Sequence, residues 1–201
     1  RETAGELSQL IQQMGGQQTP LLPGYRVRIL DGNALAATEH RLKVLRSVGA
    51  APLPGKSLVV LDPDLGLAVD IFPCEDGHAQ ERRLFGQVLA TVEPGQLWIA
   101  DRNMCTLELL TGIAERQSAF VIREHQNLPW QAVSELRSMA VIEAGEVLEQ
   151  EVTIEFEGRS LTLRRIVLRL SQPTRHGDSE IVVLPNLPVA DASATVVLQL
   201  Y

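Results

Sequence analysis

Residues 25–33 read Tyr-Arg-Val-Arg-Ile-Leu-Asp-Gly-Asn, so apolar and basic side chains alternate until the chain reaches an aspartate. Alternation with a period of two is typical of a strand with one wetter face. The pattern therefore predicts a strand with Asp31 at its C-terminal end. A second stretch, residues 96–103, reads Gln-Leu-Trp-Ile-Ala-Asp-Arg-Asn and predicts a buried strand that delivers Asp101. If the two strands are sheet neighbours, both carboxylates point into one crevice at the sheet edge.

The segments around these strands predict an α/β fold. Residues 57–61 and 67–72 are apolar runs separated by turn residues, which indicates a hairpin. A helix is expected from about residue 78 to 92, a second helix over 106–116 and a buried strand over 119–122. This order is that of an RNase H-like mixed sheet with flanking helices.

From about residue 128 the pattern changes to an antiparallel β insertion. The expected strands are residues 152–156, 161–170 and 181–184. Glu157-Gly158 provides the turn between the first two of them, and Asp191 or Ser193 is expected to cap a final helix.

The predicted organisation has four parts. Residues 1–24 form a lead-in segment with one short helix, and residues 25–127 form the first part of the RNase H-like core. Residues 128–188 form the β-rich insertion, and residues 189–201 return to the core with a truncated helix. Since the chain begins with Arg and ends abruptly after an apolar run, we expect both ends to be cut from a longer protein.

Composition limits the class of protein. A chain of 201 residues with 45% hydrophobic residues can form one sizeable core with an elaboration. Two cysteines, Cys74 and Cys105, are too few for a disulfide framework. No apolar run is long enough for a membrane span, and the first residues lack the layout of a signal peptide. We therefore expect a soluble cytoplasmic protein with no membrane partner.

The net charge of −7 argues against a simple nucleic-acid-binding protein. The charge is unevenly distributed, however. Residues 57–80 contain five acids and no base, whereas residues 25–56 contain six basic residues and two acids. The basic residues are Arg26, Arg28, Arg41, Lys43, Arg46 and Lys56. Basic side chains thus surround Asp31, although a solvated charged face is the default interpretation of such a run.

Paired carboxylates on rigid strands suit Mg²⁺, which prefers oxygen ligands and commonly completes its shell with phosphate oxygens. Two such ions about 4 Å apart activate an attacking hydroxyl and stabilise the leaving oxygen of a phosphoryl transfer. The alternative is that Asp31 and Asp101 are each a turn residue or a helix cap, which is common after a strand.

Several short motifs stand in a characteristic order along the chain. They are Asp31-Gly32-Asn33, Thr38-Glu39-His40-Arg41-Leu42, Pro52-Leu53-Pro54-Gly55, Pro73-Cys74-Glu75-Asp76-Gly77-His78-Ala79-Gln80-Glu81-Arg82, Ile99-Ala100-Asp101-Arg102-Asn103 and Phe120-Val121-Ile122-Arg123. In these motifs the chain resembles the DDE transposases of bacterial insertion sequences, in the group with a β-strand insertion between the second and third acids. The resemblance covers residues 25–201.

The resemblance implies that Asp31 and Asp101 are the first two catalytic acids and bind Mg²⁺ or Mn²⁺. The third acid of the family lies in a signature of Tyr, two residues, Arg, three residues and Glu. Tyr201 falls at the Tyr of this signature, so the Glu would lie beyond the end of the sequence. We therefore expect this fragment to be inactive although the full-length protein is an enzyme.

The resemblance also implies the partners: double-stranded DNA at the terminal repeats of the mobile element, and target DNA. The full-length protein would act as a homodimer on DNA, in the bacterial cytoplasm and at the nucleoid when bound. Arg102, Arg123 and Tyr201 are the expected DNA contacts, since arginine pairs bidentately with phosphate. Either arginine could instead neutralise nearby aspartates. Two other functions remain open: a non-catalytic relic of a transposase that binds DNA or a partner, and an RNase H-like nuclease unrelated to transposition.

Other polar and aromatic residues carry weaker hypotheses. Cys74 and His78 are spaced for a zinc ligand pair, but a buried Cys and a His at a helix start are favoured because further ligands are lacking. Trp130 is placed to stack on an unpaired base, but packing is the better interpretation. His40 and His125 lie near the motifs and stay outside the main prediction.

Overall fold

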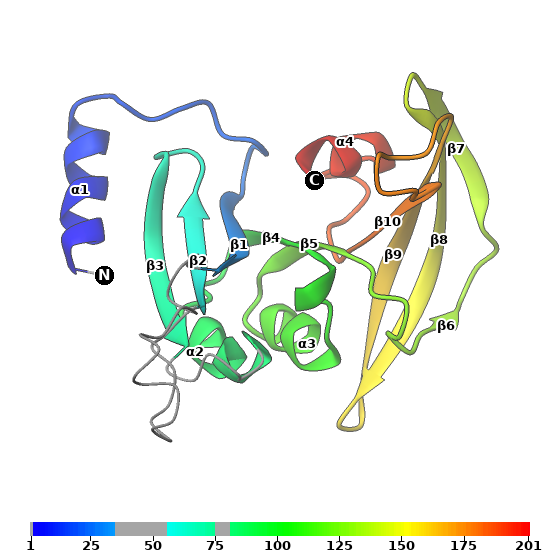
Figure 1. Ribbon diagram of the computed structural model, residues 1–201, viewed down its shortest axis with the longest axis horizontal. Coiled ribbons are helices and arrows are strands. Elements are labelled where there is room, and N and C mark those ends of the chain that lie inside the picture. Colours follow the sequence, from blue (N-terminus) through cyan, green and yellow to red (C-terminus); the bar gives the residue numbers. More distant parts are fainter. Residues whose placement is uncertain (1, 35–55, 75–80) are drawn as a thin grey trace, which may run out of the picture. The chain divides into compact units, whose positions relative to one another are not determined.

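The structure of the protein is a computed structural model that describes residues 2–34, 56–74 and 81–201 (Figure 1). The chain is α/β, with mostly antiparallel strands and a few helices. It divides into two compact units, residues 1–92 and 93–201. No helix in the described part of the chain is long and apolar enough to cross a membrane.

The first unit is built on an antiparallel sheet of three strands in the order β1-β2-β3. Its described elements are α1 (Glu2–Gln13), β1 (Arg26–Ala34), β2 (Lys56–Asp62), β3 (Leu67–Cys74), a 3₁₀ turn η2 (Glu81–Leu84) and α2 (Phe85–Leu89). The predicted hairpin is confirmed, since β2 and β3 pair along their length. Helix α1 contacts β3 but buries none of its own residues.

The prediction that Asp31 ends its strand is wrong. β1 continues to Ala34, and Asp31 pairs with Val59 inside the ladder with β2. Gly32 and Asn33 favour turns locally. Here the cross-strand hydrogen bonds of β2 hold them in extended conformation, so tertiary pairing overrides local propensity.

The predicted helix over residues 78–92 is longer than the helix found in the described residues. Its first residues lie outside them, and the chain forms a 3₁₀ turn before α2, which ends at Leu89. The amide groups of Thr91 and Val92 donate to carbonyls three residues earlier, so the last turn is tightened. Pro94 follows and disfavours further helix at the preceding residue.

The second unit is a mixed sheet in the order β4-β5-β10-β9-β8, with β6 and β7 both paired to β8. Its elements are β4 (Gln96–Ala100), the 3₁₀ turn η3 (Arg102–Met104), α3 (Leu107–Glu115), β5 (Ala119–Arg123), β6 (Gln131–Ala132), β7 (Arg137–Ile142), β8 (Gly145–Phe156), β9 (Arg159–Leu170), β10 (Glu180–Pro185) and α4 (Ala194–Leu200). β4 and β5 are parallel, and α3 connects them. The other described pairings of this unit are antiparallel.

The long hairpin of β8 and β9 dominates the antiparallel part of this unit (Figure 1). The predicted turn is confirmed, because Glu157 and Gly158 have φ values of 51° and 75°. Two positive φ values suit a tight turn between twisted strands. Strands β6 and β7 were not predicted. The exposed side chains of β7, Met139 and Val141 among them, give no clean alternation of apolar and polar residues.

A buried arginine anchors the segment that leads into α4. Arg164 of β9 binds both carboxylate oxygens of Glu149 on β8, with Nε at 2.5 Å and Nη2 at 3.2 Å. Its Nη1 donates to the carbonyls of Leu187 and Ala192 at 3.1 and 2.8 Å. Ser193 then caps α4 by accepting from Val196, as one of the two predicted caps. The guanidinium therefore ties the chain before α4 to the β8–β9 hairpin.

Candidate active site

Asp101 stands directly after a strand whose residues are all buried. Every residue of β4 is buried. Asp101 is the N-cap of the 3₁₀ turn η3. Its Oδ1 accepts a hydrogen bond from the backbone N–H of Asn103 at 2.9 Å. One oxygen of this carboxylate therefore caps a helical turn, which was the alternative interpretation of Asp101 in the sequence. The side chain is partly exposed and makes no ion pair with a described residue.

Asp31 is exposed in the middle of β1. Its Oδ1 accepts from the N–H of Gly32 at 2.8 Å. A Cβ at position 32 would lie 2.8 Å from a carboxylate oxygen of Glu81, so Glu81 rests against the bare glycine. Because successive residues of a strand face opposite sides, Glu81 approaches the face that Asp31 does not use. Glu81 is therefore not a second ligand beside Asp31.

The two aspartates belong to different units, Asp31 to the first and Asp101 to the second. Each offers carboxylate oxygens of the kind that Mg²⁺ and Mn²⁺ prefer, so the donor chemistry fits a hard divalent ion. No group of three or more Asp, Glu, His or Cys side chains suited to a metal occurs in residues 2–34, 56–74 and 81–201. The joint site of Asp31 and Asp101 stays a prediction.

Within the second unit, the other three predicted site residues gather near Asp101. Arg102 follows it in η3, and Arg123 ends β5, which runs parallel to β4. Tyr201 follows α4, and the Arg123 guanidinium lies close enough to its phenol to lower the phenol pKa. Asp101 and Arg102 both act on the same phenol electrostatically. Residues 101, 102, 123 and 201 thus form one cluster, which we call the Asp101 cluster.

Burial and the charges of the Asp101 cluster shift the pKa of Tyr201. Partial burial raises the pKa of Tyr201 above its ordinary value of 10.0, because the phenolate loses hydration. The charge of Arg123 opposes this rise, the negative charge of Asp101 adds to it, and the hydrogen bond from Arg123 and the charge of Arg102 lower it. The net result is a phenol that stays neutral at physiological pH and can donate a hydrogen bond.

The two arginines of the cluster differ in their partners. Arg123 pairs with Asp178, whose Oδ2 lies 2.9 Å from Nη2, so its alternative role of neutralising an aspartate has a concrete contact. Arg102 is exposed and forms no ion pair within the described residues. Both side chains line a hollow of about 380 Å³. Its other lining residues are Asn103, Glu124, His125, Gln126, Asp178, Glu180 and Val182.

Sequence reasoning did not find Asp178, Asn103 or Gln126. Asp178 lies in the polar loop of residues 171–179, whose composition indicates only a connection between strands. Its partner Arg123 is 55 residues away in sequence, so no local spacing marks the pair. The only available signal was a lone acid in a loop that also contains Arg175 and His176.

Two of the basic residues near Asp31 in sequence form ion pairs with Asp62. Arg28 is buried, and its Nη1 lies 2.6 Å from Oδ2 of Asp62. Arg26 approaches the same carboxylate at 3.8 Å. Two of the six basic residues are therefore directed to Asp62 on β2. Three others, Arg41, Lys43 and Arg46, lie outside the described residues, as does His40.

The Trp130 side chain is partly covered. The guanidinium of Arg165 lies 5.0 Å from the centre of its ring, and Arg165 in turn pairs with Glu124 at 2.9 Å. A cation over the ring face is a cation–π interaction, and here it lies within the fold. Cys74 is buried, in keeping with the favoured interpretation, and His78 lies outside the described residues.

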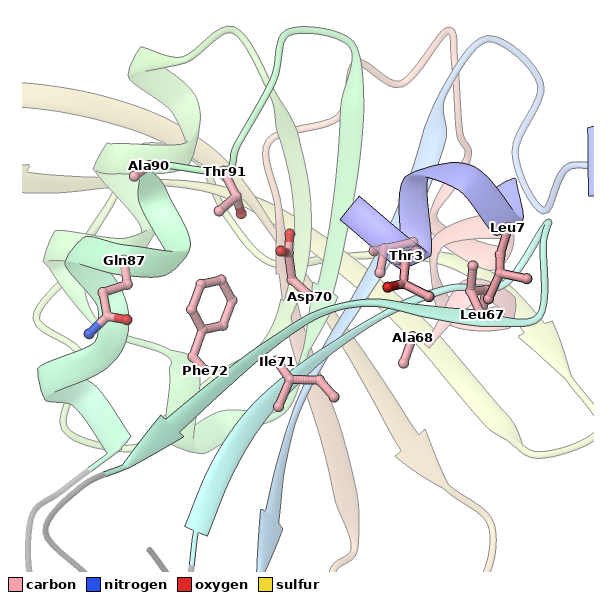
Figure 2. A pocket seen from close by; sticks show the side chains of 12 residues that line it. Thr3, Leu7, Leu67, Ala68, Asp70, Ile71, Phe72, Gln87, Ala90 and Thr91 are labelled. Atoms are coloured by element: carbon pink, nitrogen blue, oxygen red, sulfur yellow. The ribbon is translucent and has the colours of Figure 1, made fainter. Parts of the chain in front are cut away.

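The first unit has a separate apolar groove of about 580 Å³. Figure 2 shows Thr3 and Leu7 of α1, Phe72 and Asp70 of β3, and Thr91 after α2 around it. Asp70 is the only ionisable residue among the described residues that line it. The other polar side chains of the described lining are those of Thr3, Gln87 and Thr91.

Comparison of the chain with models of known protein families and with curated proteins finds no match.

Proposed function

We propose that this chain is most of the catalytic core of a DDE transposase, which cleaves and transfers DNA strands at the ends of a mobile element. The observation that carries the proposal is the Asp101 cluster. A carboxylate at the end of a buried strand stands beside two arginines and a neutral tyrosine. That combination suits a scissile phosphodiester, which needs a metal ligand, cationic contacts and hydrogen-bond donors.

The proposal includes an RNase H-like fold with an antiparallel insertion. The parallel pair β4 and β5 joined by α3, and the antiparallel strands β6 to β9, support this assignment in the second unit. The three antiparallel strands of the first unit are consistent with the first strands of an RNase H-like fold. The division at residues 24, 127 and 188 remains part of the proposal.

Each residue has a proposed role in the reaction. Asp31 and Asp101 would hold Mg²⁺ or Mn²⁺, which supplies activation of the attacking hydroxyl and stabilisation of the leaving oxygen. Arg102 and Arg123 bind and orient the phosphate oxygens, since the guanidinium fork matches them bidentately. Tyr201 donates its phenolic proton as a hydrogen bond to the same strand. No covalent enzyme intermediate is needed.

The proposed partner is double-stranded DNA, first at terminal repeats and then at the target, bound by a homodimer of the full-length protein in the bacterial cytoplasm. In the family that the chain resembles, the third acid is the Glu of the signature whose Tyr corresponds to Tyr201. The net charge of −7 is compatible with this function if other segments of the full-length protein supply most of the DNA affinity.

The test is strand cleavage by the full-length protein on two duplexes, one carrying the terminal repeat of the element and one of random sequence. We expect Mg²⁺-dependent nicking at the repeat end, and at least about a hundredfold less on random duplex. Equal rates on both duplexes would point to a general RNase H-like nuclease. Repeat binding without cleavage would point to a non-catalytic relic.

A further inference from the structure

The hollow beside the Asp101 cluster contains three acids, and each of them has an arginine partner. The pairs are Glu124 with Arg165 at 2.9 Å, Asp178 with Arg123 at 2.9 Å, and Glu180 with Arg169 at 3.0 Å. The acids that line the hollow are thus each paired with an arginine, and Arg169 is shared between Glu180 and Glu146. The net charge of the hollow is therefore less negative than the number of its acidic residues suggests.

The groups left over in the hollow are mostly hydrogen-bond donors or carry positive charge. Arg102 makes no ion pair with a described residue, and the amides of Asn103 and Gln126 line the same space. His125 Nδ1 accepts from the N–H of Asn127 at 3.2 Å, which places the proton of a neutral ring on Nε2. The hollow therefore offers one cation that has no ion-pair partner among the described residues, and several donors, a set that can bind an anion with oxygen acceptors.

An anionic group already occupies the Arg123 side of this hollow. The carboxylate of Asp178 binds the guanidinium, and the two side chains remain 34% and 23% exposed, so the pair is open to solvent. A carboxylate and a phosphate present the same two-oxygen edge to arginine. Through Oδ2, Asp178 thus takes one of the guanidinium N–H donors, Nη2, that a phosphodiester oxygen could use.

The loop that carries Asp178 is closed on itself. Thr174 and Asp178 exchange two hydrogen bonds: the Thr174 N–H donates to the Asp178 carbonyl at 2.9 Å, and the Asp178 N–H donates to the Thr174 hydroxyl at 3.2 Å. The N–H of Gly177 also donates to the Thr174 carbonyl, at 2.8 Å. Because these bonds are local, the Asp178 side chain can leave Arg123 without breaking a strand pairing.

We propose that this hollow is a phosphodiester-binding pocket and that Asp178 occupies it as a built-in phosphate mimic. A nucleic-acid phosphate binds Arg123 only by displacing Asp178, with Arg102, His125 and Gln126 as further donors. The proposal rests on the proposed function, because it takes the ligand to be a DNA strand that enters the Asp101 site. A DNA strand that has no phosphate at this position cannot displace Asp178 and therefore binds more weakly.

The main test compares DNA affinity of the full-length protein and its Asp178→Asn variant over a range of salt concentrations. Asp178→Asn keeps the size of the side chain but releases Arg123, so we expect about tenfold tighter binding at low salt. The slope of log affinity against log salt should become steeper by about one unit, as for one additional phosphate contact. Glu155→Gln is the matched control, because it removes an exposed charge of the same unit on β8.

The double variant Asp178→Asn/Arg123→Gln tests whether Arg123 makes the phosphate contact. It should lose the gain in DNA affinity that Asp178→Asn alone shows. The proposal is overturned if Asp178→Asn binds no tighter than Glu155→Gln, or if the gain survives without Arg123. Thermal unfolding of each variant shows whether it is folded. If Asp178→Asn does not fold, Asp178→Ala is a second variant that removes the carboxylate partner of Arg123.

Inorganic phosphate separates this proposal from the proposed function. Titration of phosphate, followed by the NMR signal of the Arg123 Nε–H, should saturate in Asp178→Asn at concentrations about tenfold below those needed for the wild type. If phosphate binds in this way but terminal repeats are not cleaved, the transposase function fails and the pocket stands. If repeats are cleaved normally and neither phosphate nor DNA responds to Asp178→Asn, the pocket fails alone.

Discussion

Two arginines of the second unit, Arg164 and Arg123, show how differently the same side chain can be used. Arg164 is buried, binds both oxygens of Glu149 and donates to two backbone carbonyls. Arg123 is partly exposed and is shared between Asp178 and the phenol of Tyr201. The first arginine is buried and uses four of its five N–H donors within the fold, whereas the partners of the second can be exchanged.

The difference shows that the number of polar contacts does not identify a functional arginine. A buried, saturated guanidinium holds the fold together, because removing it leaves a desolvated carboxylate without a partner. An accessible guanidinium with an exchangeable anion contributes little to stability and is available for recognition. Substitutions should therefore separate the two regions cleanly, with losses of activity around Asp101 and losses of stability around Arg164.

The largest effect is expected at the acids. In the full-length protein, Asp31→Ala and Asp101→Ala should each lower Mg²⁺-dependent nicking of terminal-repeat DNA by at least about a thousandfold, because a metal ligand is lost. Asp101→Asn should lose activity equally while retaining the N-cap of η3, since asparagine caps as well as aspartate. Unfolding free energies measured in urea should change by about 1 kcal/mol or less. Normal nicking by either alanine variant would remove the site assignment.

The next effect concerns stability. Arg164→Ala should lower the unfolding free energy by about 3–5 kcal/mol, because Glu149 stays buried without its cation and two carbonyls lose their donor. Urea unfolding measures the loss. Arg169→Ala on the same strand is the matched control: its side chain is 50% exposed and pairs with Glu146 and Glu180, so it should cost about 1 kcal/mol or less. Equal losses in the two variants would contradict the contrast between buried and open arginines.

A smaller effect tests the role of Trp130. Trp130→Leu removes the ring under Arg165 and should lower the unfolding free energy by about 1 kcal/mol, with DNA affinity unchanged. Fluorescence-monitored urea unfolding and a DNA-binding titration check the two parts. A loss of DNA affinity at unchanged stability would instead support stacking of a base on this ring.

The smallest effect is a titration. The phenol of Tyr201 should ionise above 10.0, and Arg123→Gln should raise its pKa further, since the guanidinium opposes the rise. Because the unfolded chain releases this proton first, the contribution to stability is complete below pH 10 and is lost as pH rises through the higher folded pKa. Ultraviolet absorbance of wild type and Tyr201→Phe isolates this residue from Tyr25. A phenol that ionises below 10.0 would contradict the description of the cluster.

Local patterns in the sequence were sufficient for some elements. The strand over residues 96–100 was predicted with its bounds, because an unbroken apolar run is followed at once by Asp101. The turn at Glu157-Gly158 and the cap at Ser193 were also predicted, since each depends on residues adjacent in sequence. The α/β class follows from elements of this kind.

What the sequence did not reveal depends on distant partners. β1 runs past Asp31 because β2 pairs with it, and nothing near Gly32 indicates that ladder. The contact of Asp178 with Arg123 likewise joins a loop to a strand end far along the chain. The sequence places Arg28 in a basic surface around Asp31, whereas the structure buries it against Asp62.

The most direct test of the proposed chemistry is a metal-rescue measurement on the full-length protein. A terminal-repeat duplex is prepared with sulfur in place of a non-bridging oxygen at the scissile phosphate. If a metal held by Asp31 and Asp101 contacts this phosphate, cleavage should be slow in Mg²⁺, which binds sulfur poorly, and should recover in Mn²⁺. Equal cleavage of the sulfur-substituted duplex in both metals, or cleavage with all divalent ions chelated, would contradict the account.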